Sequence, residues 1–352
     1  MTQAFGETGG GAANALTDGR PLVELRDLSV LFPRGPAVQG VDLTIMPGEA
    51  VGIVGESGSG KSVTWLAVLG LLAGDHRVGG RALLDGADLI GAPNTHLSQV
   101  RGGRIGLIFQ DPASSLNPVR RVGEQIGEAL RLHRGMSGPA LRTEAKRLFD
   151  LVGIPDAGRR IDLYPHEFSG GQNQRVMIAM ALAGQPELLV ADEPTTALDV
   201  TIQAQILSLL EDLRRELNMA LVMISHDLSV VGEVCDRISV MYAGRIVETA
   251  PTDRLFARPA HPYTRGLLDA APSLAGDRRH LVPIRGAVPE PWNMPPGCAF
   301  APRCLHARGD CGAAMPTLRD LEAGHRVRCP HADGSGRIAA PAETGELHHA
   351  AT

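Results

Sequence analysis

The sequence predicts an α/β fold in which a largely parallel sheet is covered by helices on both faces. Two continuous apolar runs, 188–191 and 220–224, are typical of strands that are buried on both sides. Between them, residues 201–217 carry apolar side chains at helical spacing. A third apolar run, 50–54, leads into a glycine-rich loop and a further helix. The order strand, helix, strand gives a layered core.

The other elements follow from the same periodicities, taken along the chain. Strands are expected at 22–32, 41–45, 51–54, 104–109, 188–191 and 220–224, and helices at 62–72 and 201–217, with a broken helical region over 120–183. After about Arg258 proline becomes frequent and regular periodicity fades. This change indicates a small appended region that differs in character from the core.

Composition narrows the class of protein. The 352 residues suit one large domain with an appendage, or two domains, and 43% hydrophobic residues are enough for a sizeable core. The 34 basic residues against 39 acidic ones give no basic footprint for nucleic acid. No apolar run reaches 18 residues, and residues 1–20 look like a flexible tail rather than a signal peptide. We therefore expect a cytosolic protein whose five cysteines form no structural disulfides.

A phosphate-binding loop is the most informative feature of the chain. It fits G-x-x-x-x-G-K-[ST] between a strand and a helix, and consists of Gly55, Glu56, Ser57, Gly58, Ser59, Gly60, Lys61 and Ser62. The glycines leave backbone N–H groups free to converge on phosphate oxygens, and the helix adds its positive end. Lys61 supplies a charge for the β- and γ-phosphates, and the Ser62 hydroxyl is a ligand for Mg²⁺.

Two acidic residues end the strand 188–191, at the sheet edge where α/β proteins bind ligands. Asp192 is expected to hold Mg²⁺, and Glu193 to orient and deprotonate the attacking water. Ser169 is a candidate N-cap for a helix that starts at Gly170 and Gly171, which makes a second helix end suited to anions. A second such end is needed if two nucleotides are shared between two chains.

These residues together give a family resemblance. From about Leu22 to Thr249 the chain resembles the ATP-binding cassette (ABC) ATPases, with every motif in order. The glycine loop resembles Walker A, and Asp192 and Glu193 resemble the Walker B pair. Gln110 resembles the Q-loop glutamine, which is also a Mg²⁺ ligand, and His226 resembles the switch histidine. The signature is matched by Ser169, Gly170, Gly171 and Gln172, and the D-loop by Ala197, Leu198 and Asp199. Phe32 resembles the aromatic residue whose ring lies against adenine. Phe168 replaces the more usual leucine before the signature serine.

The resemblance implies a fold and an activity. It implies a RecA-like parallel core with an antiparallel β subdomain and a helical subdomain at about 111–183. It also implies a head-to-tail pair of nucleotide-binding domains that sandwich ATP and Mg²⁺, with Glu193, His226 and Gln110 in catalytic roles. The expected division is a disordered tail 1–20, the nucleotide-binding domain 21–257, a C-terminal extension 258–331 and a disordered tail 332–352.

Two further segments resemble one branch of the family, the ATPase subunits of bacterial dipeptide and oligopeptide importers. These are residues 110–118, which lengthen the Q-loop, and His261-Pro262-Tyr263-Thr264-Arg265 with the cysteine-bearing tail. The resemblance implies two membrane-spanning permease subunits, a second ATPase subunit and an external substrate-binding protein. The chain would lie peripherally on the cytoplasmic face of the inner membrane and bind no nucleic acid.

Four cysteines cluster in the tail: Cys298, Cys304, Cys311 and Cys329, separated by five, six and seventeen residues. These spacings match no zinc-finger pair, so buried free thiols, a Cys₄ zinc site and an iron–sulfur cluster all remain open. Similarity to relatives of the importer type implies a 4Fe–4S cluster, structural rather than catalytic. Arg303, Arg308 and Arg328 are expected to offset thiolate charge, and Cys235 to be a core residue.

Other functions stay open at this stage. A soluble ABC ATPase that acts on DNA or ribosomes is the main rival, although the chain has no basic excess and no second cassette. Nickel or haem are alternative cargoes for an importer of this kind. The sequence does not name the cargo, because selectivity in such importers lies mainly in the external binding protein.

Overall fold

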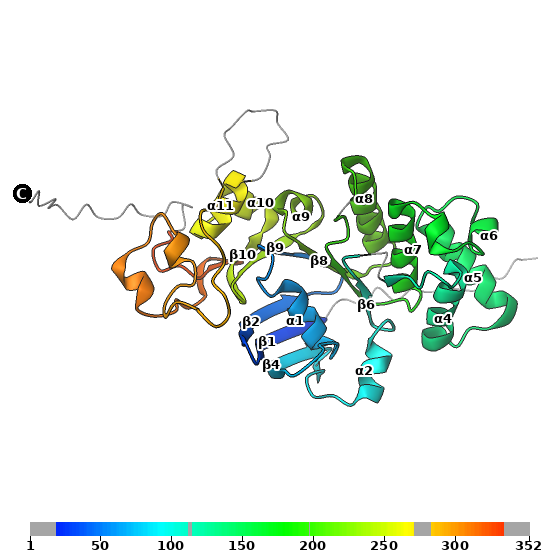
Figure 1. Ribbon diagram of the computed structural model, residues 1–352, viewed down its shortest axis with the longest axis horizontal. Helices are drawn as coiled ribbons and strands as arrows, with labels where there is room; N and C mark the ends of the chain where they lie inside the picture. The colour runs from blue at the N-terminus through cyan, green and yellow to red at the C-terminus, as the bar shows by residue number, and fades with distance from the viewer. Residues whose placement is uncertain (1–18, 112–114, 197, 271–282, 334–352) are drawn as a thin grey trace, which may run out of the picture.

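The computed structural model describes residues 19–111, 115–196, 198–270 and 283–333. The predicted terminal tails, Ala197 of the D-loop and residues 112–114 of the lengthened Q-loop lie wholly or mainly outside these ranges. Two sheets and a set of helices build the molecule (Figure 1). In the described part of the chain, no helix is long and apolar enough to span a membrane.

The first sheet is antiparallel, with strand order β2-β1-β4-β5. Its strands are β1 (Val23–Phe32), β2 (Gly35–Ile45), β4 (Arg77–Leu84) and β5 (Ala87–Asp88). β1 confirms the predicted strand at 22–32, whereas β2 begins six residues before the predicted start at Val41. The helix α2 (Asn94–Val100) follows this sheet. This is the antiparallel subdomain that the family resemblance implied.

The second sheet has the strand order β11-β12-β10-β9-β3-β8-β7-β6. Its strands are β3 (Ala50–Val54), β6 (Ile105–Ile108), β7 (Leu188–Asp192), β8 (Ala220–Ser225), β9 (Arg237–Tyr242), β10 (Arg245–Pro251), β11 (Arg319–Glu322) and β12 (His325–Val327). The five strands from β9 to β6 run parallel, as the continuous apolar runs predict. Alternate residues confirm burial on both faces: Val222 and Ile224 of β8 pack into one core, while Leu221 and Met223 pack into the other.

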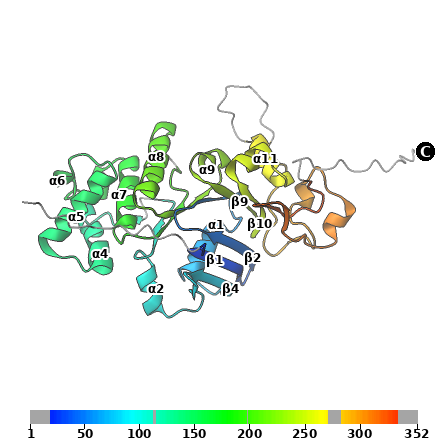
Figure 2. The same ribbon diagram turned by 180° about the vertical axis from the view of Figure 1, so that it is seen from behind.

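Helices flank the parallel sheet and form a separate group beside it (Figures 1 and 2). They are α1 (Lys61–Val68), α4 (Val122–Arg134), α5 (Gly138–Leu151), α6 (Ala157–Arg160), α7 (Gly170–Leu182), α8 (Val200–Glu216), α9 (Leu228–Val234), α10 (Thr252–Ala257) and α11 (Pro262–Ala270). α4 to α7 confirm the broken helical region. α1 ends earlier than the predicted Leu72, because Gly70 takes a left-handed backbone with φ 60° just beyond it.

The C-terminal extension continues the main sheet. β12 pairs antiparallel with β10, and β11 pairs with β12 at the sheet edge. The sequence pattern missed these strands because four and three residues are too few to show alternation. Buried Glu248 on β10 joins the parts: it accepts hydrogen bonds from the N–H groups of Ala260 and His261 at 2.7 and 2.8 Å, and lies 2.8 Å from the His325 ring on β12. The extension is thus bonded to the edge of the core sheet.

Candidate active site

The phosphate-binding loop follows β3 and opens α1. Gly58 and Gly60 have φ of 78° and 98°, which side-chain-bearing residues rarely adopt. A Cβ on Gly55 would lie 2.1 Å from the Met241 carbonyl oxygen, so the chain needs glycine there. The Lys61 ammonium is buried and donates to the carbonyl oxygens of Gly55 and Glu56 at 2.7 and 3.1 Å. Burial lowers the pKa of this ammonium, and nearby carboxylates oppose the shift.

Four parallel strands deliver the other predicted residues to the same edge. β6, β7, β8 and β3 are neighbours in that order, and their carboxyl ends lead to Gln110, Asp192, His226 and the phosphate loop. Asp192 pairs with Ile224, and Val54 pairs with Ser225, so the strand ends are in register. Residues far apart in sequence therefore meet at the edge where α/β proteins bind ligands.

Asp192 and Ser62 form an oxygen-rich site beside the loop. Oδ1 of Asp192 is buried and has no hydrogen-bond partner among the described residues, and the Ser62 hydroxyl lies beside the same carboxylate. Burial and then the charge of Glu193 raise the pKa of Asp192, while Ser62 and Lys61 lower it. A buried carboxylate oxygen without a partner and a hydroxyl are donors that fit Mg²⁺, which binds oxygen ligands.

Glu193 lies at the centre of a contact network that unites the predicted catalytic residues. Its carboxylate accepts hydrogen bonds from the Gln110 amide at 3.0 Å and from the Thr196 hydroxyl at 2.9 Å. The His226 ring lies 3.3 Å from its other oxygen. The Glu193 backbone has φ 46°, a strained value that its N–H bond to the Ile224 carbonyl (2.9 Å) helps to maintain. Thr196 was not among the predicted site residues.

The predicted signature forms the N-terminus of α7. Ser169 accepts from the Gln172 N–H at 3.4 Å, and the Gln172 side chain accepts from the Ser169 N–H at 3.1 Å, which is a capping box. A Cβ on Gly171 would lie 2.6 Å from Ile202 of α8, so this glycine also permits helix packing. Asp199 caps α8 through the Ile202 N–H at 3.0 Å. Both views place α7 with α4 to α6, apart from α1.

Phe32 lies at the end of β1 on a wide, open cleft of about 520 Å³. The His76 ring also lines this cleft, with its centroid 6.3 Å from that of Phe32 and the two planes inclined by 56°. No sequence pattern pointed to His76, a lone histidine just before β4.

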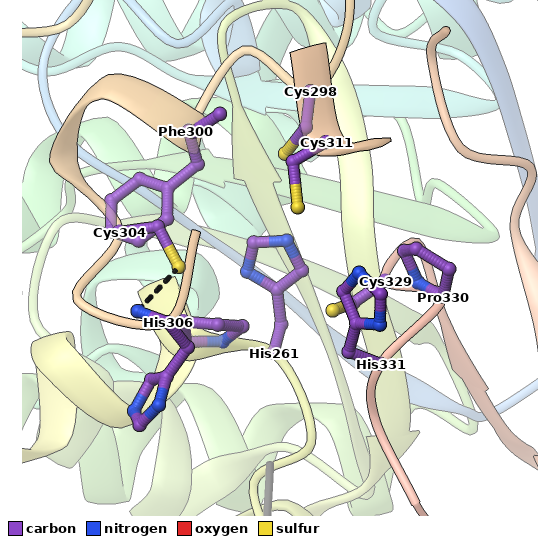
Figure 3. A pocket seen from close by; sticks show the side chains of 11 residues that line it. His261, Cys298, Phe300, Cys304, His306, Cys311, Cys329, Pro330 and His331 are labelled. Carbon is purple, nitrogen blue, oxygen red and sulfur yellow. Dashed lines mark hydrogen bonds between the residues drawn. The ribbon is translucent and has the colours of Figure 1, made fainter. Parts of the chain in front are cut away.

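The four tail cysteines line one small cavity of about 20 Å³ in the extension, together with His261, His306 and His331. Figure 3 shows their side chains around the ring of His261. Two of the sulfurs accept a hydrogen bond from a backbone N–H: Cys304 from His306 and Cys311 from Arg308, both at 3.4 Å. Hydrogen bonds to sulfur are also found around cluster-bound thiolates.

The thiols lie in a dry environment. Burial raises the pKa of Cys298 and Cys329, and raises that of Cys304 to about 11. Burial also lowers the pKa of His261 to about 4, and its Nδ1 accepts from the Tyr263 N–H at 3.1 Å. His261 is therefore neutral, with its proton on Nε2.

The spread of possible ligands bears on which metal would fit. In the described part of the chain, one group of three or more donors has all its atoms within 4.8 Å of one another, and it consists of Asp310, Cys311 and His331. The four sulfurs are therefore more widely spread than the ligands of one tetrahedral zinc ion, which bonds sulfur at about 2.3 Å. The thiols thus do not meet at one point as the ligands of a single ion would, and the His261 ring lies among them (Figure 3).

Two of the arginines expected to offset thiolate charge have other partners. Arg303 forms a two-pronged ion pair with Glu56 of the phosphate loop. Arg328 donates to the carbonyl oxygens of Ile246 and Pro316, both at 3.0 Å. Closeness in sequence did not predict where these side chains point, because their directions depend on the conformations of the loops that carry them. Cys235 is buried at the end of α9, as expected.

Comparisons with known proteins agree with this architecture. The sequence matches the ABC transporter family over residues 38–196 and the oligopeptide/dipeptide transporter C-terminal region over residues 247–311. A peptide import ATP-binding protein of Brucella abortus is 52% identical over 315 residues, covering 88% of this chain and 95% of that protein. The oligopeptide transport ATP-binding protein OppD of Haemophilus influenzae is 48% identical over 313 residues, covering 88% and 97%.

Among solved structures, the ATP-binding cassette MJ0796, in a dimeric post-hydrolysis state bound to ADP and Pi, aligns with a TM-score of 0.59. It is 30% identical, and the alignment covers 65% of this chain and 98% of that one. The alignment therefore takes in nearly all of that cassette and about two thirds of this chain.

Proposed function

This chain belongs to the ABC transporter family, and from that membership we propose that it is the ATP-hydrolysing subunit of an importer for dipeptides or oligopeptides. The two family matches and the peptide-transport relatives support import over action on DNA or ribosomes, and over nickel or haem as cargo. The observation that carries the activity is the convergence of Lys61, Asp192, Glu193 and His226 at one sheet edge.

The geometry supports the following division of labour. Backbone N–H groups of residues 55–62 and the Lys61 ammonium hold the phosphates. Ser62, Asp192 and Gln110 would hold Mg²⁺, which, when bound, offsets charge on the phosphate oxygens. Glu193 orients and deprotonates water, held by Gln110, Thr196 and His226. Phe32 stacks on the base.

The second anion-binding helix end supports a paired arrangement. Helix α7 lies apart from α1, the helix that the phosphate-binding loop of its own chain opens (Figures 1 and 2). We propose that Ser169, Gly170, Gly171, Gln172 and Asp199 act on ATP held by the other ATPase subunit. Two permease subunits and an external binding protein complete the importer. The chain lies on the cytoplasmic face of the inner membrane, and residues 21–257 and 258–331 serve as its cassette and its extension.

The test uses the assembled importer in vesicles and labelled peptide. Lys61→Ala is expected to abolish ATP binding and peptide uptake together, while Lys146→Ala, which removes the same charge from α5, keeps ATP binding. Wild-type uptake in the Lys61→Ala importer would refute the proposal. ATPase activity that responds to DNA or ribosomes in a salt-sensitive way, and not to peptide, would favour the rival function.

For the cysteine cavity we propose a structural 4Fe–4S cluster held by Cys298, Cys304, Cys311 and Cys329. The backbone N–H donors to two of the sulfurs and the spread of the thiols support this choice over zinc. Iron, acid-labile sulfide and zinc are measured in protein purified without oxygen, with Cys298→Ser as the variant and Cys235→Ser as the control. Iron and sulfide near four per chain, lost in Cys298→Ser, are expected. Zinc near one per chain, or no metal, would contradict the cluster.

A further inference from the structure

The extension contacts the phosphate-binding loop at its second residue. Glu56 donates its backbone N–H to the Tyr263 hydroxyl at 2.8 Å. Its carboxylate accepts two hydrogen bonds from the Arg303 guanidinium, at 2.5 and 2.9 Å. Both partners lie beyond residue 257, outside the cassette itself. One loop residue is therefore held through its main chain and its side chain by the appended region.

The Arg303 side chain is built into this position rather than lying loose on the surface. It is 5% exposed, and its Nε donates to the Arg285 carbonyl at 2.8 Å. Its guanidinium carbon lies 5.8 Å from the ring centroids of both Tyr242 and Phe300. The hydrogen bond to Glu56 raises the pKa of Arg303, so the group stays charged. The Glu56 side chain is 30% exposed, so the pair is buried on the arginine side only, but its two-pronged geometry is stronger than that of a single-contact surface ion pair.

The negative charge of Glu56 makes its contact with Arg303 relevant to nucleotide binding. A loop that binds a polyphosphate carries a carboxylate in its own sequence, and like charges at short range repel, most strongly where water is excluded. Arg303 sets a positive charge directly against that carboxylate. The Tyr263 hydroxyl at the same time accepts from the backbone N–H of Glu56 and so holds the main chain of the loop.

We propose that Arg303 is a positioning residue of the nucleotide site, which neutralises Glu56 and, together with Tyr263, holds the phosphate-binding loop ready for ATP. The extension is then part of the ATP site and not only an appendage of the importer. This inference rests on the proposed function, since it concerns ATP at the same loop. It assigns to the extension an effect on ATP affinity and leaves the hydrolytic step to Glu193 and its partners.

The experiment measures ATP affinity of the full-length chain at low and high salt, with ATP turnover of the assembled importer beside it. Arg303→Gln is expected to weaken ATP binding about tenfold, equivalent to about 1.4 kcal/mol. Turnover at saturating ATP should change little. The ATP affinity of Arg303→Lys should lie between those of the wild type and Arg303→Gln, because lysine keeps the charge but loses the two-pronged geometry of the guanidinium. The defect should shrink at high salt as screening weakens the repulsion.

The decisive variant is the double substitution Arg303→Gln with Glu56→Gln. If Arg303 acts by offsetting charge, removal of the carboxylate restores most of the lost affinity. If Arg303 matters only for folding of the extension, the double variant stays as weak as Arg303→Gln, and the proposal is wrong. Arg254→Gln is the matched control, because Arg254 also joins the core to the extension, through Glu322 and the Ala323 carbonyl, away from the loop.

Two further outcomes separate this inference from the proposed function. Unchanged ATP affinity in Arg303→Gln, with binding still lost in Lys61→Ala, overturns the role of Arg303 and leaves the ATPase intact. ATP affinity that Lys61→Ala does not alter overturns both. Equal weakening in Arg303→Gln and Arg254→Gln would show general docking of the extension and would also overturn the proposal.

Discussion

The nucleotide site and the cysteine cavity are built in opposite ways. The first collects residues from widely separated positions, and it does so because β6, β7, β8 and β3 are parallel neighbours whose carboxyl ends meet. The second draws most of its lining from one loop-rich stretch, 298–331, with His261 and Pro262 added from the start of α11. Strand ends position the residues of the nucleotide site. The cysteine cavity depends instead on hydrogen bonds and ion pairs between its loops and the folded core. The strand-built region is therefore robust to local change, whereas the extension is tied to a few anchoring side chains.

The largest expected effect falls on the strand-built region. Glu193→Gln should keep ATP binding and lose roughly 10²–10⁴-fold in turnover, because the amide replaces the base without disturbing the strand end. Steady-state hydrolysis by the importer and the ATP dissociation constant are the two measurements. Glu233→Gln on α9, an exposed acid, serves as the control. Equal turnover in the Glu193 variant and wild type would remove the general-base role.

The next effect tests whether the extension depends on its anchors. Glu248→Gln should weaken the attachment by about 3 kcal/mol, because an amide cannot accept both backbone N–H bonds and the His325 contact as a carboxylate does. Hydrogen exchange at the Ala260 and His261 amides should accelerate, while amides of β7 and β8 stay protected. Glu290→Gln, an exposed change in the extension, is the control. Unaltered exchange at both amides would argue against Glu248 as an anchor.

A smaller effect is expected in the pH dependence of the stability of the extension. His261 has a folded pKa of about 4, below its ordinary value of about 6.5, because it is buried. Between these values the unfolded chain binds a proton that the folded chain does not, so the extension loses stability as pH falls. Denaturant unfolding of the extension at pH 7 and pH 5 measures how steeply its free energy of unfolding depends on pH. His261→Gln should weaken this dependence. The exposed His96→Gln should leave it intact, and an equally steep slope in the His261 variant would refute the assignment.

The smallest effect concerns the base rather than the phosphates. Phe32→Ala should weaken ATP binding about tenfold, within the range of about 1–3 kcal/mol for loss of one base–aromatic stack, and leave saturated turnover unchanged. Titration with ATP measures the affinity. Phe256→Ala on α10 removes a partly exposed ring elsewhere. An unchanged dissociation constant would separate Phe32 from the nucleotide.

Most of the fold and the core of the site could be predicted from sequence for a physical reason. Burial on both faces produces continuous apolar strands, and phosphate binding needs a glycine loop at a helix start, so both leave local patterns. Parallel strands bring their ends together without further information, which is why Gln110, Asp192, Glu193 and His226 meet as expected. The two extension strands, β11 and β12, were not predicted because three or four residues are too few to show alternation. The strands β4, β5, β9 and β10 were not predicted either.

What only the tertiary structure decided are the contacts between segments with no shared local pattern. Arg303 was expected beside the thiols, yet it reaches Glu56, 247 residues away in sequence. His76 lies beside Phe32, and Glu248 joins β10 to His325. Periodicity reports which face of a segment is buried, and motifs report local backbone chemistry. The direction of a long charged side chain in a loop depends on how the finished surfaces pack, and that is settled only when the whole chain has folded.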